Sequence, residues 1–81
     1  MNTVKYLVIR FSSIGDIVLT TPVVRMLKQQ VENAEVHYLT KSKFRSLVDS
    51  NPYVDKVHAL EDNMPAIINT LQEEGYDYVI D

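Results

Sequence analysis

The chain has 81 residues, of which 46% are hydrophobic, and it carries a formal net charge of −3, two histidines and no cysteine. This length lies near the lower limit for independent folding and excludes a complete two-domain enzyme, because domains typically need about 100 residues or more apiece. The acidic balance argues against nucleic-acid binding through bulk positive charge. The absence of cysteine excludes a disulfide framework and a thiolate metal site, which fits a reducing compartment.

The first predicted element is a buried parallel strand at residues 6–11, YLVIRF, which is followed by turn-forming residues. This apolar run is too short to span a membrane, and the region lacks the cleavage site of a secretory signal, so we expect a cytoplasmic protein. A helix follows from Ile17 onward, because apolar residues recur at helical spacing and give one face toward the sheet: Leu19, Val23, Met26, Leu27 and Val31. Pro22 leaves two geometries open: a helix that begins near Gly15 and kinks at Pro22, or a single turn before a main helix capped by Thr21.

The remaining elements alternate in the same way. Residues 35–40 predict a second strand, residues 44–48 a short helix that ends before Pro52, and residues 54–60 a third strand. The spacing of Met64, Ile67, Ile68 and Leu71 predicts a third helix. Gly75 is placed to close that helix in the left-handed conformation, and a fourth strand follows at residues 76–80.

The order βαβαβαβ with short connections predicts an α/β fold, a Rossmann-like parallel sheet with strand order 3-2-1-4. In this arrangement strands one and four are neighbours, and the turn at residues 12–16 lies close to Asp81 at the crevice where the winding reverses. Strand four is left as an apolar edge. We therefore expect further chain downstream, with residues 1–81 forming part of a larger domain.

The turn after strand one, SSIGD, has two interpretations. Gly15 meets a steric need, Ser12 or Ser13 caps the next helix, and Asp16 complements the helix dipole. Alternatively, hydroxyls and free backbone N–H groups at the carboxyl edge of a parallel sheet bind a phosphate or a polar acceptor, and the carboxylate, ionised near the positive helix end, accepts a proton. Residue types alone do not decide between these interpretations.

Other common site types do not fit. With only two glycines, neither a dinucleotide fingerprint nor a P-loop can be written, and strand two ends in LTK without the acidic residue that binds a ribose. The acidic pair of a phosphoacceptor module is missing after strand one, which ends in Arg10 and Phe11. His37 and His58 fall inside predicted strands, and no His/Asp/Glu grouping has ligand spacing, so no metal site is predicted.

The segment VIRFSSIGDIVLTTPVVRMLKQQ strongly resembles the N-terminal signature of the heptosyltransferase family, glycosyltransferase family 9, and the downstream strands are similar to that family as well. The resemblance implies the N-terminal half of a GT-B architecture, in which an acceptor-side domain faces a second domain that binds the nucleotide sugar. Residues 1–81 then form a partial acceptor-side domain. Because the nucleotide-sugar domain is absent, we expect this segment alone to be inactive.

The resemblance also implies residue roles. Asp16 matches the proposed general base of an inverting transfer of heptose, or a related sugar, to a lipopolysaccharide-core or similar envelope glycolipid. Ser12, Ser13 and Gly15 are expected to contact the acceptor, and Lys41 is expected to meet its anionic groups, although a solvated basic loop explains Lys41 equally well.

No cofactor is expected besides a nucleotide-sugar donor, ADP-heptose by resemblance, which the missing domain binds. Contact with the inner membrane is expected to be peripheral, through the lipid-linked acceptor. A non-catalytic Rossmann-like binding or interaction module remains the alternative.

Overall fold

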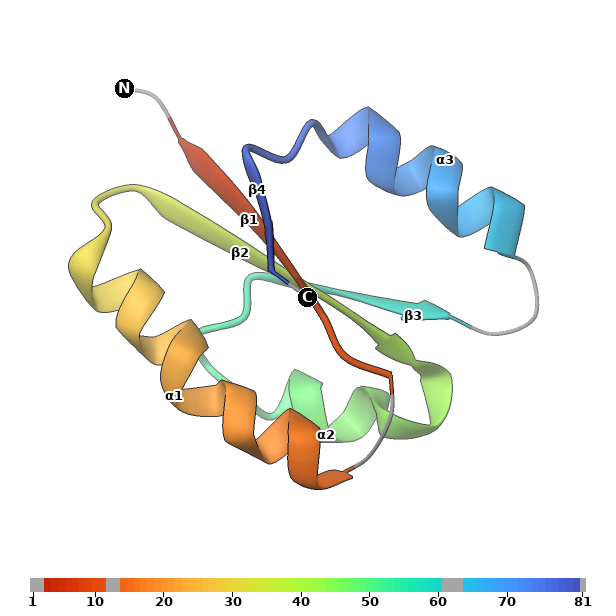
Figure 1. Ribbon diagram of the computed structural model, residues 1–81, viewed down its shortest axis with the longest axis horizontal. Helices are drawn as coiled ribbons and strands as arrows, with labels where there is room; N and C mark the ends of the chain where they lie inside the picture. The colour runs from red at the N-terminus through yellow and green to blue at the C-terminus, as the bar shows by residue number, and fades with distance from the viewer. Residues whose placement is uncertain (1–2, 12–13, 61–63, 81) are drawn as a thin grey trace.

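The computed structural model describes residues 3–11, 14–60 and 64–80. Strands and helices alternate along these ranges, as Figure 1 shows. The strands are β1 (Val4–Ile9), β2 (Ala34–Lys41), β3 (Lys56–Leu60) and β4 (Tyr78–Ile80). The helices are α1 (Ile14–Gln30), the 3-10 turn η1 (Ser42–Phe44), α2 (Arg45–Asp49) and α3 (Met64–Glu74).

The strands form one parallel sheet in the order β3-β2-β1-β4. The predicted α/β class and the predicted order 3-2-1-4 are therefore confirmed. β1 pairs with β2 from Val4↔Ala34 to Ile9↔Leu39 and pairs with β4 on its other side. The central position of β1 places the start of α1 at the point where the winding of the sheet reverses.

The α1 helix begins at Ile14, beside Gly15, and runs without interruption through Pro22, as in the first of the two predicted geometries. The kink that this geometry included at Pro22 stays a prediction. A proline inside a helix leaves the carbonyl four residues earlier without its usual donor. Here that carbonyl belongs to Val18, a residue that is 56% exposed, so water can satisfy it. Exposure on this side of the helix explains why Pro22 is tolerated.

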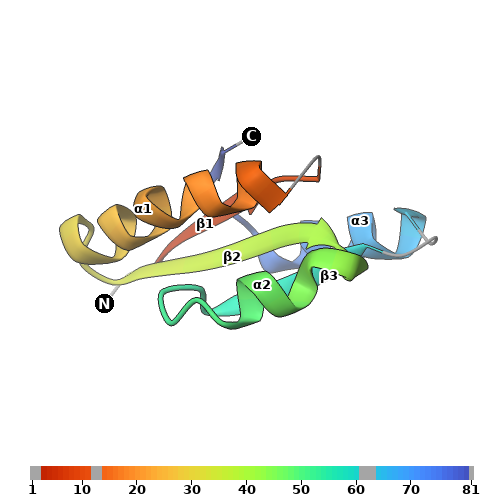
Figure 2. The ribbon, with the colours of Figure 1, turned by 90° about the horizontal axis from the view of Figure 1, so that it is seen from below.

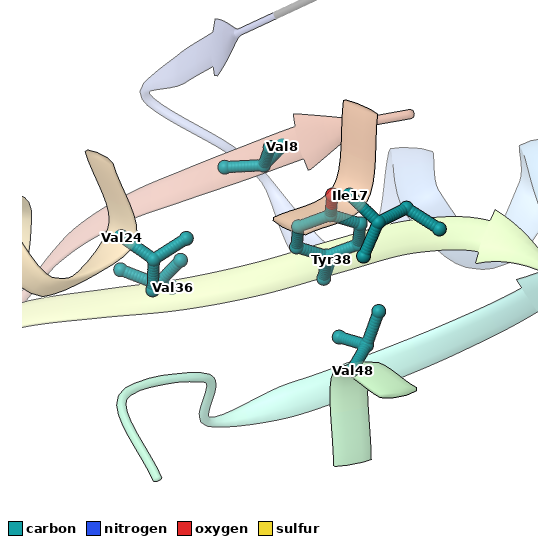
Figure 3. Close-up of a cluster of buried hydrophobic side chains, with 6 residues drawn as sticks. All are labelled: Val8, Ile17, Val24, Val36, Tyr38 and Val48. Carbon is teal, nitrogen blue, oxygen red and sulfur yellow. The ribbon is translucent and has the colours of Figure 1, made fainter. Parts of the chain in front are cut away.

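The two faces of the sheet are covered by different helices. In Figure 1, α1 and α2 lie on one side of the sheet and α3 lies on the other. Figure 2 shows α1 and α2 alongside the sheet, seen from below. The main apolar core lies between the sheet and the helices α1 and α2, and Figure 3 shows its members. These members are Val8, Ile17, Val24, Val36, Tyr38 and Val48. Because strand side chains alternate between faces, His37 and Leu39 point to the α3 side.

The ends of the elements differ by a few residues from the sequence expectation. The third strand begins at Lys56 and not at residue 54, because the Val54 N–H closes a turn on the Asn51 carbonyl at 3.2 Å. The first strand covers residues 4–9, so the predicted range 6–11 was about two residues too late at both ends; the fourth covers residues 78–80 and begins about two residues later than predicted. Gly75 has a φ of +66°, which confirms the predicted left-handed close of α3.

Within the described ranges, no helix has both the length and the apolar character that crossing a membrane requires.

Candidate functional site

The candidate site lies at the carboxyl edge of β1 and β2, where α1 begins. Asp16 is in the first turn of α1, and its side chain is partly buried, whereas Gly15 beside it is exposed. A carboxylate in this position is stabilised by the partial positive charge of the helix N-terminus. Ser12 and Ser13, which were also predicted to contact a ligand, lie outside the described residues, as does Asp81.

Asp16 belongs to a local group of charges around the buried Tyr38. Burial raises the pKa of the Tyr38 hydroxyl, a hydrogen bond with Thr20 and the charge of Arg10 oppose this shift, and the charge of Asp16 adds to it. Arg10 itself continues the β1–β2 ladder, since its backbone N–H donates to the Leu39 carbonyl at 3.1 Å. The Asp16 carboxylate and the Arg10 guanidinium therefore both act on the Tyr38 phenol. The sequence pattern did not connect Asp16 with either residue.

A buried chain of hydrogen bonds links Tyr38 to the turn that carries Asp16. The Thr20 hydroxyl donates to the Ile17 carbonyl at 2.7 Å, and the Thr20 and Tyr38 hydroxyl oxygens are 2.7 Å apart. Because the single hydrogen of Thr20 is used on Ile17, the Tyr38 hydroxyl is the donor to Thr20. β2 thus holds the first turns of α1, and with them Asp16, through side chains as well as by apolar packing.

The lysines after β2 occupy the same edge of the sheet. Lys41 is the last residue of β2 and is exposed, two positions beyond Leu39, which is in register with Ile9 of β1. The ammonium of Lys43 lies over the Phe44 ring, 5.0 Å from its centroid. The structure therefore places Lys41 on the same rim as Asp16 and gives Lys43 an aromatic partner.

The first turns of α1 also present apolar side chains to solvent. Ile14 and Val18 are each 56% exposed and Leu19 is 74% exposed. The sequence pattern assigned Leu19 to the face that packs on the sheet, and this assignment was wrong, because Ile17 and Thr20 take the buried positions instead. An apolar exposed strip next to a partly buried carboxylate suits an amphipathic ligand or another protein surface.

The two histidines lie on the opposite face of the sheet. His37 of β2 and His58 of β3 are buried, and their nearest ring nitrogens are 3.2 Å apart. Tyr76 and Glu74 complete this region: the Tyr76 hydroxyl is 2.7 Å from Nδ1 of His37, and Glu74 Oε2 is 3.1 Å from the same atom. Residues 37, 58, 74 and 76 have no common spacing, so only the folded chain brings them together.

Electrostatics differ among these groups. Burial lowers the pKa of His58, and the charges of His37 and Lys56 act in the same direction. Burial raises the pKa of Tyr76, and the charge of Glu74 adds to this. Burial opposes ionisation of Glu74, but Lys5 and Lys56 outweigh it and lower the pKa of that carboxyl. The region thus favours a neutral imidazole, a neutral phenol and an ionised carboxylate.

The fold is similar to part of a solved protein structure. A crystal structure of a glycosyltransferase of family 9 from Veillonella parvula DSM 2008 superimposes on 98% of this chain with a TM-score of 0.81 and 19% sequence identity. The match covers 26% of that protein. The four-stranded parallel sheet with interleaved helices is therefore a fold that occurs within a family 9 glycosyltransferase.

Curated proteins add sequence similarity to this structural match. The chain is 29% identical to lipopolysaccharide heptosyltransferase 1 of Campylobacter coli over 83 residues, covering 95% of this chain and 24% of the relative. It is 29% identical to lipopolysaccharide heptosyltransferase 3 of Escherichia coli (strain K12) over 76 residues, covering 82% and 22%. No family profile matches the chain.

These comparisons confirm the resemblance to heptosyltransferases and to glycosyltransferase family 9 that the sequence motif indicated. The chain spans about a quarter of the length of the relatives that it matches. Its homologues are glycosyltransferases.

Proposed function

We propose that this chain is the acceptor-side segment of an inverting GT-B glycosyltransferase, with Asp16 as the general base. The observation that carries the proposal is the position of Asp16, a partly buried carboxylate in the first helical turn after the central strand, in a chain similar to heptosyltransferases. Ligands of open parallel sheets bind at this edge, outside the carboxyl ends of the strands. The geometry that supports the proposal concerns the surroundings of Asp16. In this proposal the nucleotide sugar binds to a part of the full-length protein outside residues 1–81.

The proposed reaction transfers heptose, or a related sugar, from a nucleotide sugar to a hydroxyl of an envelope glycolipid such as a lipopolysaccharide core. The Asp16 carboxylate takes the proton of the acceptor hydroxyl, and the acceptor oxygen forms a bond to the anomeric carbon of the donor. The bond between that carbon and the diphosphate breaks on the opposite face, and the nucleoside diphosphate leaves with the electron pair. Configuration at the anomeric carbon inverts, and the transition state has oxocarbenium character, as in glycoside hydrolysis.

The other predicted residues take binding roles in this proposal. Ser12 and Ser13 hydrogen-bond the acceptor, and the exposed Gly15 lets it approach the backbone closely. Lys41, exposed on the same rim, attracts phosphates or carboxylates of the acceptor. The strip of Ile14, Val18 and Leu19 offers an apolar surface to a lipid-linked acceptor, which fits peripheral contact with the cytoplasmic side of the inner membrane.

The test is an assay of the full-length protein with ADP-heptose and a lipopolysaccharide-core acceptor. Asp16→Ala is expected to lower kcat by about 100- to 10,000-fold, the usual contribution of a general base. Asp49→Ala is the matched control, because Asp49 is an exposed carboxylate on α2 that forms an ion pair with Arg45 in the same helix. Circular dichroism establishes that both variants are folded.

Three outcomes separate the parts of the proposal. Near-normal transfer by the Asp16→Ala variant overturns the base assignment. If the unmodified protein turns over a different nucleotide sugar and Asp16→Ala abolishes that turnover, the assignment of Asp16 as base stands and the proposed donor is replaced. Failure of the unmodified protein with every nucleotide sugar, together with binding of the acceptor, favours a non-catalytic binding module.

A further inference from the structure

A group of ligand-type side chains lies on the α3 side of the sheet, away from the candidate acceptor site. His37 of β2, His58 of β3 and Glu74 of α3 each contribute one nitrogen or oxygen atom, and these atoms all lie within 4.8 Å of one another. We call these three residues the α3-face cluster. Both histidines are buried, and the Glu74 side chain is 22% exposed, so the cluster is enclosed but opens to solvent on one side.

The separations within the α3-face cluster suit ligands of one metal ion. Nδ1 of His37 is 3.2 Å from Nε2 of His58 and 3.1 Å from Oε2 of Glu74. Two atoms bonded to Zn²⁺ at about 2.0–2.1 Å and placed at tetrahedral corners lie about 3.3 Å from each other. Two of the three separations are therefore close to the edges of a tetrahedral site, and the third, between His58 and Glu74, is within 4.8 Å.

The hydrogen atoms available in this region do not satisfy all of these contacts. Nε2 of His37 is 2.6 Å from a carboxylate oxygen of Glu35, which only accepts, so this nitrogen carries the ring hydrogen. In a neutral ring, Nδ1 is then an acceptor, and the Tyr76 hydroxyl 2.7 Å away can donate to it. Glu74 Oε2, 3.1 Å from Nδ1, has no hydrogen to share with it, so a cation bound to both atoms removes the repulsion between them.

We propose that His37 Nδ1, His58 Nε2 and Glu74 Oε2 bind a divalent transition-metal ion, with Zn²⁺ as the preferred metal. Two imidazoles and one carboxylate form a common zinc ligand set. Glu35 supplies the outer carboxylate that metal-bound histidines usually have, which orients the ring and fixes its tautomer. The Tyr76 hydroxyl is 2.7 Å from His37 Nδ1 and 3.0 Å from His58 Nε2, so it gives up its hydrogen bond to these nitrogens when the metal binds.

Two lysines near Glu74 oppose a bound cation. The Lys56 and Lys5 ammonium groups are 3.6 Å and 4.0 Å from Glu74 Oε2. The Lys56 side chain is 55% exposed, and an ion pair of this kind contributes little, so Lys56 can turn into solvent when a metal binds. The Lys5 ammonium keeps a second contact when a metal binds, because it also donates to the backbone carbonyl of Glu74.

The site joins three elements that are distant in the chain. β2 and β3 are hydrogen-bonded neighbours, but α3 is held on this face without the large apolar core that fixes α1 and α2. A metal bound to the α3-face cluster ties the end of α3 to the middle of the sheet. Its expected effect is structural and does not depend on the proposed transferase activity.

The test is metal binding to the full-length protein after treatment with a chelator. Addition of Co²⁺, a spectroscopic substitute for Zn²⁺, is expected to give the strong visible absorption of a tetrahedral complex, saturating at one equivalent. Zn²⁺ is expected to displace Co²⁺ and to raise the Tm, because a ligand bound only to the folded state stabilises it. Neither readout requires activity.

Variants assign the site to the named residues. Glu74→Gln and His58→Gln are expected to abolish the absorption, and Glu35→Gln to weaken binding by about 10- to 100-fold. Glu73→Gln is the matched control, because Glu73 is the neighbouring exposed residue of α3. Lys56→Gln is expected to tighten binding by removing a competing cation from Glu74.

Two results overturn the proposal. One is the absence of saturable Co²⁺ binding. This includes the case in which the stability of the protein responds to pH but not to metal, so that a proton shared by the two histidines takes the place of the metal. The other is Co²⁺ binding that is equally strong in the unmodified protein, Glu74→Gln and Glu73→Gln, which locates the metal elsewhere. Circular dichroism of the metal-free variants separates loss of binding from loss of folding.

Discussion

The two faces of the β-sheet hold their polar groups in different ways. On the α1 side, Asp16 lies at the carboxyl edge of the sheet, next to an apolar core that includes Val8 and Val36, and the exposed Lys41 ends β2 at the same edge. On the α3 side, His37 and its partners bring polar groups into the middle of the sheet, beside the buried Leu7 and Leu39. A face that is stabilised by a continuous apolar core leaves the polar groups at its edge available to a ligand. On a face with buried polar groups, those groups need hydrogen-bond or metal partners for the protein to be stable.

The largest expected effect separates catalysis on the α1 side from binding on the α3 side. Asp16→Asn keeps the size of the side chain but removes the proton acceptor, so transfer by the full-length protein is expected to fall by about 100- to 10,000-fold. Cobalt binding at the α3-face cluster is expected to be unchanged. Loss of both in the same variant would contradict the independence of the two faces.

The next effect tests which side of α1 contributes to stability. Ile17 is 4% exposed and Leu19 is 74% exposed. Ile17→Ala is expected to lower the free energy of unfolding by about 2–5 kcal/mol, through lost burial and a residual cavity. Leu19→Ala, the control on the same helix, is expected to change it by about 0.5 kcal/mol or less. Urea denaturation measures both, and equal costs would mean that α1 packs on the sheet in another orientation.

A smaller effect concerns the connection between α3 and β4. Gly75 has a φ of +66°, and a Cβ added there meets no atom within 4 Å, so a substitution is strained only by the backbone conformation. Gly75→Ala is expected to cost about 1–2 kcal/mol of stability. Gly75→Asn is expected to cost less, because asparagine tolerates the left-handed region better. Denaturant midpoints measure the order, and an equal cost for the two variants would point to crowding in place of backbone strain.

The smallest effect is the contribution of the Tyr38 hydroxyl. Tyr38→Phe removes a buried hydrogen bond to Thr20 and is expected to cost about 0.5–1.5 kcal/mol near neutral pH. Burial raises the pKa of Tyr38, so the folded state keeps a proton that the unfolded state loses near pH 10. This contribution is complete below the unfolded pKa and declines as the pH rises toward the folded one.

The alkaline comparison checks the assignment. The loss of stability between neutral and strongly alkaline pH is expected to be shallower in Tyr38→Phe than in the unmodified protein, as measured by denaturation at a series of pH values. A constant difference between the two proteins across the whole series would show that Tyr38 ionises equally in the folded and unfolded states.

Most of the architecture was predictable from local patterns. Apolar periodicity placed each strand and helix, and the short connections allowed only a right-handed parallel sheet with β1 next to β4. The path of α1 through Pro22 was not predictable, because a proline inside a helix and a proline at its first turn share one sequence. In the folded chain α1 continues through Pro22, and the residue four positions earlier, Val18, is exposed, which is compatible with a proline there.

The sequence by itself determined the fold class, the strand order and the position of Asp16 at the start of α1, because these follow from residue periodicity and from motifs contiguous in the chain. Only the tertiary structure decided that Tyr38 and Thr20 support that turn, and that His37, His58 and Glu74 converge. The pairing of β2 with β3 brings His37 to His58, 21 positions away, and the packing of α3 brings Glu74 to His37 from a more distant part of the chain. No spacing rule along the chain records such contacts.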